Sequence, residues 1–267
     1  MALFKVVTTL NVEMRDIVQV GDNANLMGNS LYKTLETKIM MEKTHIIILS
    51  IVMSFMATGL FSQESIDFHF GPSFPIADFA DDDFNNESAG GASMGVSLGF
   101  QYLFPINQNG LGIFLGVDGS YNSLRESVRD NIDRFYEENG LGNAEITYYR
   151  YINIPISAGL SYIIPSDENT TAFFRAGVVS NFFKITNHEI KVGTDKLTME
   201  FDWANQFGFR FGGGALINEN ISITLDYYGL GEHSTKGIVE FNGVPDPEDV
   251  DIKQKVSLII IALGFRF

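Results

Sequence analysis

The residue types of a Ser-His-Asp triad occur together near the start of the patterned part of the chain, as Asp67, His69 and Ser73. In such a triad the histidine takes a proton from the serine hydroxyl while the aspartate orients the histidine. These residues lie two and four positions apart, so an extended chain would place them in one row on a single face. A row on one strand does not surround a reacting atom. We therefore expect a structural role for Asp67 and His69, and we predict that the protein is not an enzyme.

Four oxygen-bearing side chains alternate in the segment DDDFNNE: Asp81, Asp83, Asn85 and Glu87. A calcium-binding loop begins with this spacing, but it also requires a glycine at its sixth position and a glutamate at its twelfth. Asn86 and Ala92 occupy those two positions. The segment is therefore predicted to be a solvated acidic loop, with weak binding of a divalent cation as the alternative. No cofactor is expected.

The composition removes several classes of function. The 267 residues include no cysteine, which excludes disulfide bridges, thiolate metal sites and thiol nucleophiles. The formal net charge is −15, whereas a nucleic-acid partner requires a basic surface.

Residues 46–61, IIILSIVMSFMATGLF, form the most apolar run of the chain. The run is shorter than the roughly 20 residues of a membrane-spanning helix. A preceding Lys43 and a following FSQ are typical of a secretory signal peptide, here 41–62 with cleavage after Ser62. A membrane anchor or a buried helix is the alternative. Because a signal peptide starts a protein, residues 1–40 are interpreted as a non-native upstream extension.

Beyond Gln63, apolar and polar residues alternate with a period of two. In SMGVSLGFQYLF (93–104) the even positions are large and apolar, and the odd ones are mostly small or polar. This pattern is typical of a strand with one apolar and one polar face. It recurs in eight predicted strands: 65–76, 93–106, 111–123, 146–164, 170–184, 199–217, 221–231 and 252–267.

The connections between these segments alternate in length. Short turns fall at 107–110, 166–169 and 218–220, and long polar loops fall at 77–92, 124–145, 185–198 and 232–251. Outer-membrane barrels have this asymmetry, with short periplasmic turns and longer extracellular loops. The predicted fold of residues 63–267 is therefore an all-β, eight-stranded antiparallel up-and-down transmembrane β-barrel.

The polar face of the strands decides between a membrane barrel and a soluble lipocalin-like carrier. A soluble carrier lines its cavity with apolar residues, whereas a membrane barrel turns them towards lipid. Aspartates and arginines can pair inside a narrow membrane barrel. The predicted interior polar network comprises Asp67, His69, Asp118, Arg175, Asp202, Gln206, Arg210, Asp226 and Arg266, and the same face carries Gln101 and Asn153.

The segment SLRESVRDNIDRFYEENG (123–140) departs from the strand pattern. Ser123 and Glu126 have the spacing of a capping box, and Gly140 is a residue that ends helices. Apolar residues recur every four positions, as they do along one face of a helix, at Leu124, Val128, Ile132 and Tyr136. We predict a short amphipathic helix that packs over the barrel mouth; recognition of a partner is the alternative.

Four basic residues fall on the lipid-facing phase near the outer strand ends: Arg150, Lys184, Lys253 and Lys255. Charges at this rim can bind lipopolysaccharide phosphates through charge-assisted hydrogen bonds. The alternative is ordinary rim charge that faces water.

Three segments carry a family resemblance: YINIPISAGLSYII (151–164), FGFRFGGGALI (207–217) and ISITLDYYGLGE (221–232). With these segments and a terminal Phe, residues 63–267 resemble the outer-membrane β-barrel domain family of Bacteroidota, which includes PorT-like and OmpX-like proteins. The resemblance implies insertion from the periplasm by the barrel assembly machinery, with Phe265 and Phe267 as the assembly signal. PorT-like members also imply assistance to protein secretion. No single activity follows, because a fold does not fix a function.

Eight strands enclose a lumen just wide enough for side chains to fill. The sequence therefore favours a non-enzymatic outer-membrane protein of a Gram-negative bacterium, with a plugged polar interior. It would act through its extracellular loops and rim in a structural, adhesive or secretion-accessory role. A small-solute porin is the first alternative, and a soluble lipocalin-like carrier is the second. The expected partners are outer-membrane lipid, lipopolysaccharide, the barrel assembly machinery and a secreted or surface protein.

Overall fold

The computed structural model describes residues 65–83, 86–107, 109–165, 169–246 and 250–267. The predicted upstream extension (1–40) and signal peptide (41–62) lie outside these residues.

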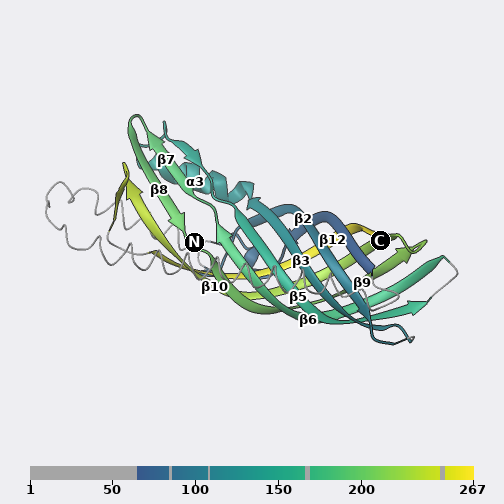
Figure 1. Cartoon of the computed structure of the whole chain (residues 1–267). Coiled ribbons are helices and arrows are strands. Elements are labelled where there is room, and N and C mark those ends of the chain that lie inside the picture. The colour runs from purple at the N-terminus through teal and green to yellow at the C-terminus, as the bar shows by residue number, and fades with distance from the viewer. Residues whose placement is uncertain (1–64, 84–85, 108, 166–168, 247–249) are drawn as a thin grey trace, which may run out of the picture. The chain divides into compact units, whose positions relative to one another are not determined.

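Eight long antiparallel strands form a closed ring (Figure 1). They are β1 (Ser65–Pro75), β2 (Ala92–Pro105), β3 (Leu111–Leu124), β5 (Tyr151–Pro165), β6 (Thr170–Ile185), β9 (Ala204–Ile217), β10 (Ile221–Phe241) and β12 (Val250–Arg266). Neighbours pair in this order, and β12 pairs with both β10 and β1, which closes the ring. The predicted eight-stranded antiparallel up-and-down barrel is confirmed. Short turns join the strands at one end, the short-turn end, and long connections at the other, the long-loop end.

The sheet continues beyond the ring at the long-loop end. There β10 pairs with β12 on one side and with β8 (Asp195–Phe201) on the other. β8 pairs with β7 (His188–Val192), and β7 pairs with β4 (Glu145–Thr147). β11 (Val244–Pro245) pairs back onto the tip of β10. In Figure 1, β7 and β8 lie with helix α3 at this end, and the C-terminus lies at the other.

The prediction of loops at 185–198 and 232–251 is therefore wrong over most of their length. The two-residue alternation continues along β10, with His233, Thr235 and Val239 buried and Ser234, Lys236 and Ile238 exposed between them. Polar composition does not by itself distinguish a loop from such a strand, because an antiparallel strand with one solvated face also carries many polar residues.

Helix α3 (Glu126–Glu138) confirms the predicted helix but not its predicted start. The predicted capping residue Ser123 belongs to β3. The N-cap is instead Arg125, which makes no side-chain capping bond. The end matches the prediction: Gly140 has a φ of 81°. The N–H groups of Gly140 and Leu141 donate to the carbonyls of Glu137 at 3.0 Å and Tyr136 at 2.9 Å, which is a Schellman ending.

All four predicted apolar positions are buried, but Leu124 is the last residue of β3, so the apolar stripe of α3 consists of Val128, Ile132 and Tyr136. Val128 lies against Gly91, where an added Cβ would come within 2.6 Å of Val128 Cγ2. Ser127 Oγ also donates to Asp82 at 2.5 Å. The helix therefore packs against the connection between β1 and β2. None of the helices in the described ranges is long and apolar enough to cross a membrane.

An apolar cluster, here called the plug, closes the lumen near the long-loop end. Phe79 of the 3-10 helix η1 (Ala77–Phe79) is fully buried. Its ring centroid lies 5.0 Å from that of Tyr151 and 6.4 Å from that of Phe183. On β12 the inward residues Leu258 and Ile260 are also buried, so the inner face of that strand is apolar at mid-height.

Candidate functional site: a buried polar network and an outer rim

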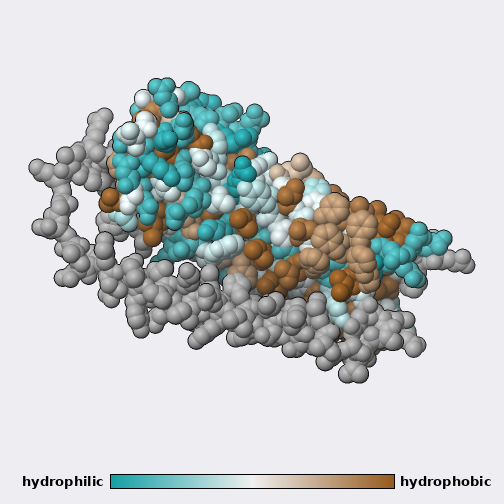
Figure 2. All heavy atoms as spheres, turned by 45° about the horizontal axis from the view of Figure 1, so that its top comes forward, coloured by the Kyte–Doolittle hydropathy of each residue, from teal (hydrophilic) through white to brown (hydrophobic). Residues whose placement is uncertain are grey.

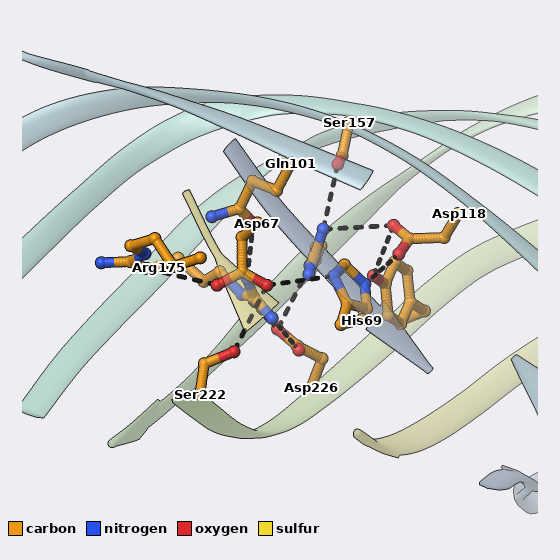
Figure 3. A network of polar contacts seen from close by, with 11 residues as sticks. Asp67, His69, Gln101, Asp118, Ser157, Arg175, Ser222 and Asp226 are labelled. Atoms are coloured by element: carbon orange, nitrogen blue, oxygen red, sulfur yellow. Dashed lines mark hydrogen bonds and ion pairs between the residues drawn. The ribbon is translucent and has the colours of Figure 1, made fainter. Parts of the chain in front are cut away.

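A network of charged and polar side chains from several strands meets inside the barrel (Figure 3). At its centre Asp226 of β10 accepts hydrogen bonds from Arg175 Nε at 2.7 Å and from Arg210 Nε at 3.2 Å. Arg175 Nη2 also donates to Asp226, and its Nη1 donates to Gln101. Arg210 Nη1 reaches Asp118 Oδ2 and Ser157 Oγ, both at 3.2 Å.

Asp118 of β3 is the second acceptor of the network. His69 Nε2 lies 2.6 Å from its Oδ1, and the Tyr228 hydroxyl donates to its Oδ2 at 2.8 Å. The Arg210 guanidinium also lies over the Tyr228 ring, with 4.9 Å between Cζ and the ring centroid. The phenol therefore supports both members of the Arg210–Asp118 ion pair.

Asp67 forms the third acceptor, nearer the short-turn end. Ser222 Oγ donates to it at 3.3 Å, and Arg266 Nη2 lies 3.5 Å away. His69 Nδ1 is 3.6 Å from Asp67 Oδ1, which is an electrostatic contact but too long for a hydrogen bond. Ser73 is remote from this contact, since its hydroxyl is paired with Asn122 at 3.4 Å. The imagined Asp67–His69–Ser73 row therefore forms no triad.

Every strand of the ring contributes at least one side chain to the network. Three arginines face three aspartates, so their formal charges balance when His69 is neutral. Arg175, Arg210 and Asp226 are at most 2% exposed at their side chains. Breaking such a buried pair is costly because the remaining charge has neither water nor a partner.

Two predicted members, Asp202 and Gln206, are not part of the network, and both are exposed. Asp202 lies between β8 and β9, where the alternation slips. Odd residues such as Met199 and Phe201 are buried in β8, and even residues such as Arg210 are buried in β9. Gln206 lies beyond Phe209, the last residue of β9 that pairs with β10. A single unbroken period across 199–217 could not detect this slip.

Three members of the network were missed by sequence reasoning: Ser157, Ser222 and Tyr228. Each lies an even number of residues from an inward-facing residue that the sequence does predict, and therefore on the same face of its strand. Ser157 is four residues from Asn153, and Ser222 and Tyr228 are four and two residues from Asp226. Alternation alone would have found them. A further signal is glycine, because a Cβ on Gly99 would lie 2.1 Å from Asp118 Oδ1.

Asp81 of the acidic loop is paired within the loop. Asp81 accepts from the Asn86 side chain at 2.8 Å and from the N–H of Asp83 at 3.1 Å, and these bonds, the Asn86 one first, lower the pKa of Asp81. Within the described ranges no group of three His, Cys, Asp or Glu residues could hold a metal ion. Asn85, one of the four candidate ligands with Asp81, Asp83 and Glu87, lies outside them.

The four rim cations differ in their contacts. Lys255 forms an ion pair with Asp78 at 3.0 Å, and that bond raises the pKa of Lys255. Arg150 lies over the Tyr121 ring at 5.5 Å and donates to the Tyr121 hydroxyl at 2.8 Å. Lys184 lies over the Trp203 ring at 5.7 Å. Lys253 is exposed on β12. The predicted assembly-signal residues Phe265 and Phe267 are 40% and 82% exposed.

No model of a known protein family and no curated protein sequence matches the chain. Among solved structures, the barrel is similar to a major outer membrane protein from Thermus thermophilus, with 14% identity, a TM-score of 0.45, and 77% of this chain and 99% of that chain covered. It is also similar to OprG from Pseudomonas aeruginosa, with 10% identity, a TM-score of 0.43, and coverages of 78% and 97%. For Neisserial surface protein A the identity is 13%, the TM-score 0.39, and the coverages 77% and 96%. At these identities nothing about ligands or partners is transferred, and the PorT-like resemblance stays a prediction.

Proposed function

We propose that the protein is an integral β-barrel of a Gram-negative outer membrane, without enzymatic activity, that acts through its long-loop end and outer rim. The observation that supports this proposal is an apolar band around the outside of the ring. Every barrel strand contributes to it a large apolar side chain that is at least 40% exposed: Phe70, Val96, Ile113, Leu160, Val178, Phe207, Leu225 and Ile261. Figure 2 shows this band between hydrophilic ends on the face in view. Soluble proteins rarely expose so much contiguous apolar surface, whereas lipid covers it in a membrane barrel.

Cell fractionation and gel migration test this proposal. The protein is expected in the outer-membrane fraction, and an unboiled sample is expected to migrate differently from a boiled one because the closed barrel resists detergent. Recovery in the soluble periplasmic fraction without a heat-dependent shift would support the lipocalin-like carrier. The ion pairs of the lumen and the apolar exterior speak against that alternative.

The porin alternative meets two obstacles in series. The plug fills one part of the lumen and the ion-pair network fills another, and Phe79 and Arg210 are each at most 1% exposed. A diffusion pore requires a continuous water-filled path, which eight strands seldom leave.

The long-loop end is the proposed site of structural, adhesive or secretion-accessory work. It presents α3 and the edge strand β4. A photocrosslinker at Glu138, which is exposed on α3, should capture a surface or secreted protein in intact cells. The same group at Asn107, exposed at the short-turn end, is the control. The barrel assembly machinery is a proposed transient partner through Phe265 and Phe267.

Arg150 and Lys184 are the proposed contacts to lipopolysaccharide phosphates. Lys184 is opposite Ile152 in the β5–β6 register, so Arg150 projects from the same outer face two residues away. Among the described residues neither cation has a carboxylate partner within ion-pair distance. Tyr121 and Trp203, which hold them, are aromatics of the kind that favour the membrane interface. Lys255 is less available because Asp78 already neutralises it.

Two double variants of equal charge test the rim assignment. Arg150→Gln with Lys184→Gln should weaken lipopolysaccharide binding to the purified barrel at least about tenfold, since each lost charge-assisted hydrogen bond is worth more than 1 kcal/mol. Lys253→Gln with Lys255→Gln should leave it nearly unchanged. Equal losses in both variants would indicate diffuse charge rather than a site.

A further inference from the structure

A second polar layer lies between the ion-pair network and the plug, and it contains no charged side chain. It consists of Ser97, Ser120, Asn153, Asn181 and His233, all at most 4% exposed. Ser97 is opposite Ser120, and Ser120 is opposite Asn153, in the strand registers. Asn181 Nδ2 lies 3.0 Å from both Asn153 Oδ1 and His233 Nε2. The five side chains therefore form a continuous arc on the inner wall, here called the neutral layer.

Each residue of the neutral layer has one buried polar atom without a hydrogen-bond partner among the described residues. These atoms are Ser97 Oγ, Ser120 Oγ, Asn153 Nδ2, Asn181 Oδ1 and His233 Nδ1. A buried donor or acceptor that stays unpaired loses the hydrogen bonds it made to water in the unfolded chain. Such atoms are rare singly in folded proteins, and five adjacent ones would remove much of the small free energy that keeps a protein folded.

Reassigning the two amide groups does not remove these atoms. If both amides are turned over, Asn153 Nδ2 can donate to Asn181 Oδ1, but Asn153 Oδ1 then loses its donor. The two serine hydroxyls and His233 Nδ1 are unaffected. Among the described residues nothing pairs with these atoms, so the layer offers several hydrogen bonds to a ligand.

We propose that the neutral layer binds a cluster of ordered water molecules inside the lumen. The free atoms include a donor, Asn153 Nδ2, an acceptor, Asn181 Oδ1, and two hydroxyls that can do either. A ligand that matches this set must both donate and accept, and it must be uncharged because the layer offers no balancing charge. Water meets both conditions and makes about three hydrogen bonds at such sites.

Solvent reaches the wall beside this layer. Gln206 is opposite Asn181 in the β6–β9 register and is exposed. Next to it β10 bulges between Gly229 and Gly231, and a Cβ on Gly231 would lie 2.8 Å from Gln206 Cγ. Water molecules of the layer would exchange with bulk solvent at this seam.

Nuclear Overhauser effects between water and side-chain amide protons, measured in lipid nanodiscs, test the proposal. The amide protons of Asn153 and Asn181 should show cross-relaxation with long-lived water, separated from chemical exchange by rotating-frame spectra. Asn122 is the internal control, because it is fully buried and its Nδ2 faces the carbonyls of Ser93 at 3.1 Å and Ser73 at 3.4 Å. Its amide should show no such signal.

The proposal is overturned if the amide protons of Asn153 and Asn181 show no more cross-relaxation with water than those of Asn122. It is also overturned if the cross-relaxation comes from a molecule other than water. Ser120→Val adds volume beside Asn153 and should abolish the water signal at Asn153. If this variant does not fold, the comparison of the three asparagines in the wild type still decides.

Discussion

Asp226 is the residue on which the interior charge balance depends most directly. Its carboxylate accepts from two guanidinium groups, those of Arg175 and Arg210, and all three side chains are at most 2% exposed. In water each group would be solvated by itself, but inside the lumen each depends on the others. Removing one partner and leaving the others should therefore lower the free energy of unfolding.

Replacing Asp226 with alanine would leave both guanidinium groups without their shared acceptor. We expect the free energy of unfolding to fall by about 3–5 kcal/mol, the usual cost of breaking a buried ion pair. Asp130 is exposed on α3, so Asp130→Ala should change that free energy by less than about 0.5 kcal/mol. Denaturant unfolding in detergent micelles, followed by the fluorescence of Trp203, measures both. Equal changes would contradict the role of Asp226.

Gly99 and Gly119 offer a matched pair on neighbouring strands. A Cβ on Gly99 would lie 2.1 Å from Asp118 Oδ1 and 2.6 Å from His69 Nε2, whereas a Cβ on Gly119 would meet nothing closer than 3.9 Å. Gly99→Ala should therefore separate His69 from Asp118 and lower the unfolding temperature, and Gly119→Ala should not. Thermal unfolding measured as the loss of the heat-resistant gel band compares them. An unchanged unfolding temperature in Gly99→Ala would mean that His69 and Asp118 can move apart without loss of stability.

Single residues were predictable where the alternation was unbroken. The phase of Asp67, Asp118, Arg175, Arg210, Asp226 and Arg266 followed from a period of two, because side chains of one strand alternate strictly between its faces. Asp202 was assigned to the wrong face because the period slips at the β8–β9 break. No local sequence signal told which aspartate would meet which arginine, since their partners lie on other strands.

At the scale of elements, the lengths of the strands were harder to predict from the sequence than their number or order. β10 runs from Ile221 to Phe241, ten residues further than predicted. Its second half pairs with β12 and β8 but carries polar side chains such as Glu232, Ser234 and Lys236, a composition that it shares with loops. The predicted loop 185–198 covers β7 and the first part of β8 for the same reason, whereas the last residues of β8, from Met199, fall inside a predicted strand. Helix α3 was predictable because its four-residue apolar period has no equivalent in a strand.

His188 gives the β7–β8 hairpin a dependence on pH. It is 1% exposed, its ring lies 5.8 Å from that of Tyr149, and burial lowers its pKa to about 4 from the ordinary 6.5. Below pH 6.5 the unfolded hairpin binds a proton that the folded one does not bind. The hairpin should therefore lose stability as the pH falls from about 6.5 to about 4, by up to about 3 kcal/mol.

Hydrogen exchange of the β7–β8 amides between pH 7 and pH 4.5, corrected for the intrinsic rates, measures this loss. His188→Gln removes the titrating group, so protection in that variant should change much less over the same interval. The β5–β6 ladder inside the ring is the reference, because neither of its strands contains a histidine, an aspartate or a glutamate. An equal loss in the wild type and in the variant would assign the effect to other groups.

At the scale of the whole molecule, the closed ring followed from the alternation of short and long connections, but the way the lumen is filled did not. The ion-pair network could be expected from the polar inner face. The plug could not, because Phe79 lies in a connection without periodicity, where sequence gives no indication of which side chain turns inward. Two unlike barriers, one ionic and one aromatic, therefore lie in series along one lumen.

This arrangement predicts the electrical behaviour of the barrel. In planar lipid bilayers the wild type should produce no steady ion current, and Phe79→Ala should also produce none, because the ion pairs around Asp226 still close the lumen after the plug is weakened. A general porin in the same bilayers is the positive control, and the heat-dependent gel shift of each preparation verifies that the barrel is folded. A steady current through the wild type would support the porin alternative. A current through Phe79→Ala alone would mean that the plug, and not the network, is the barrier to ions.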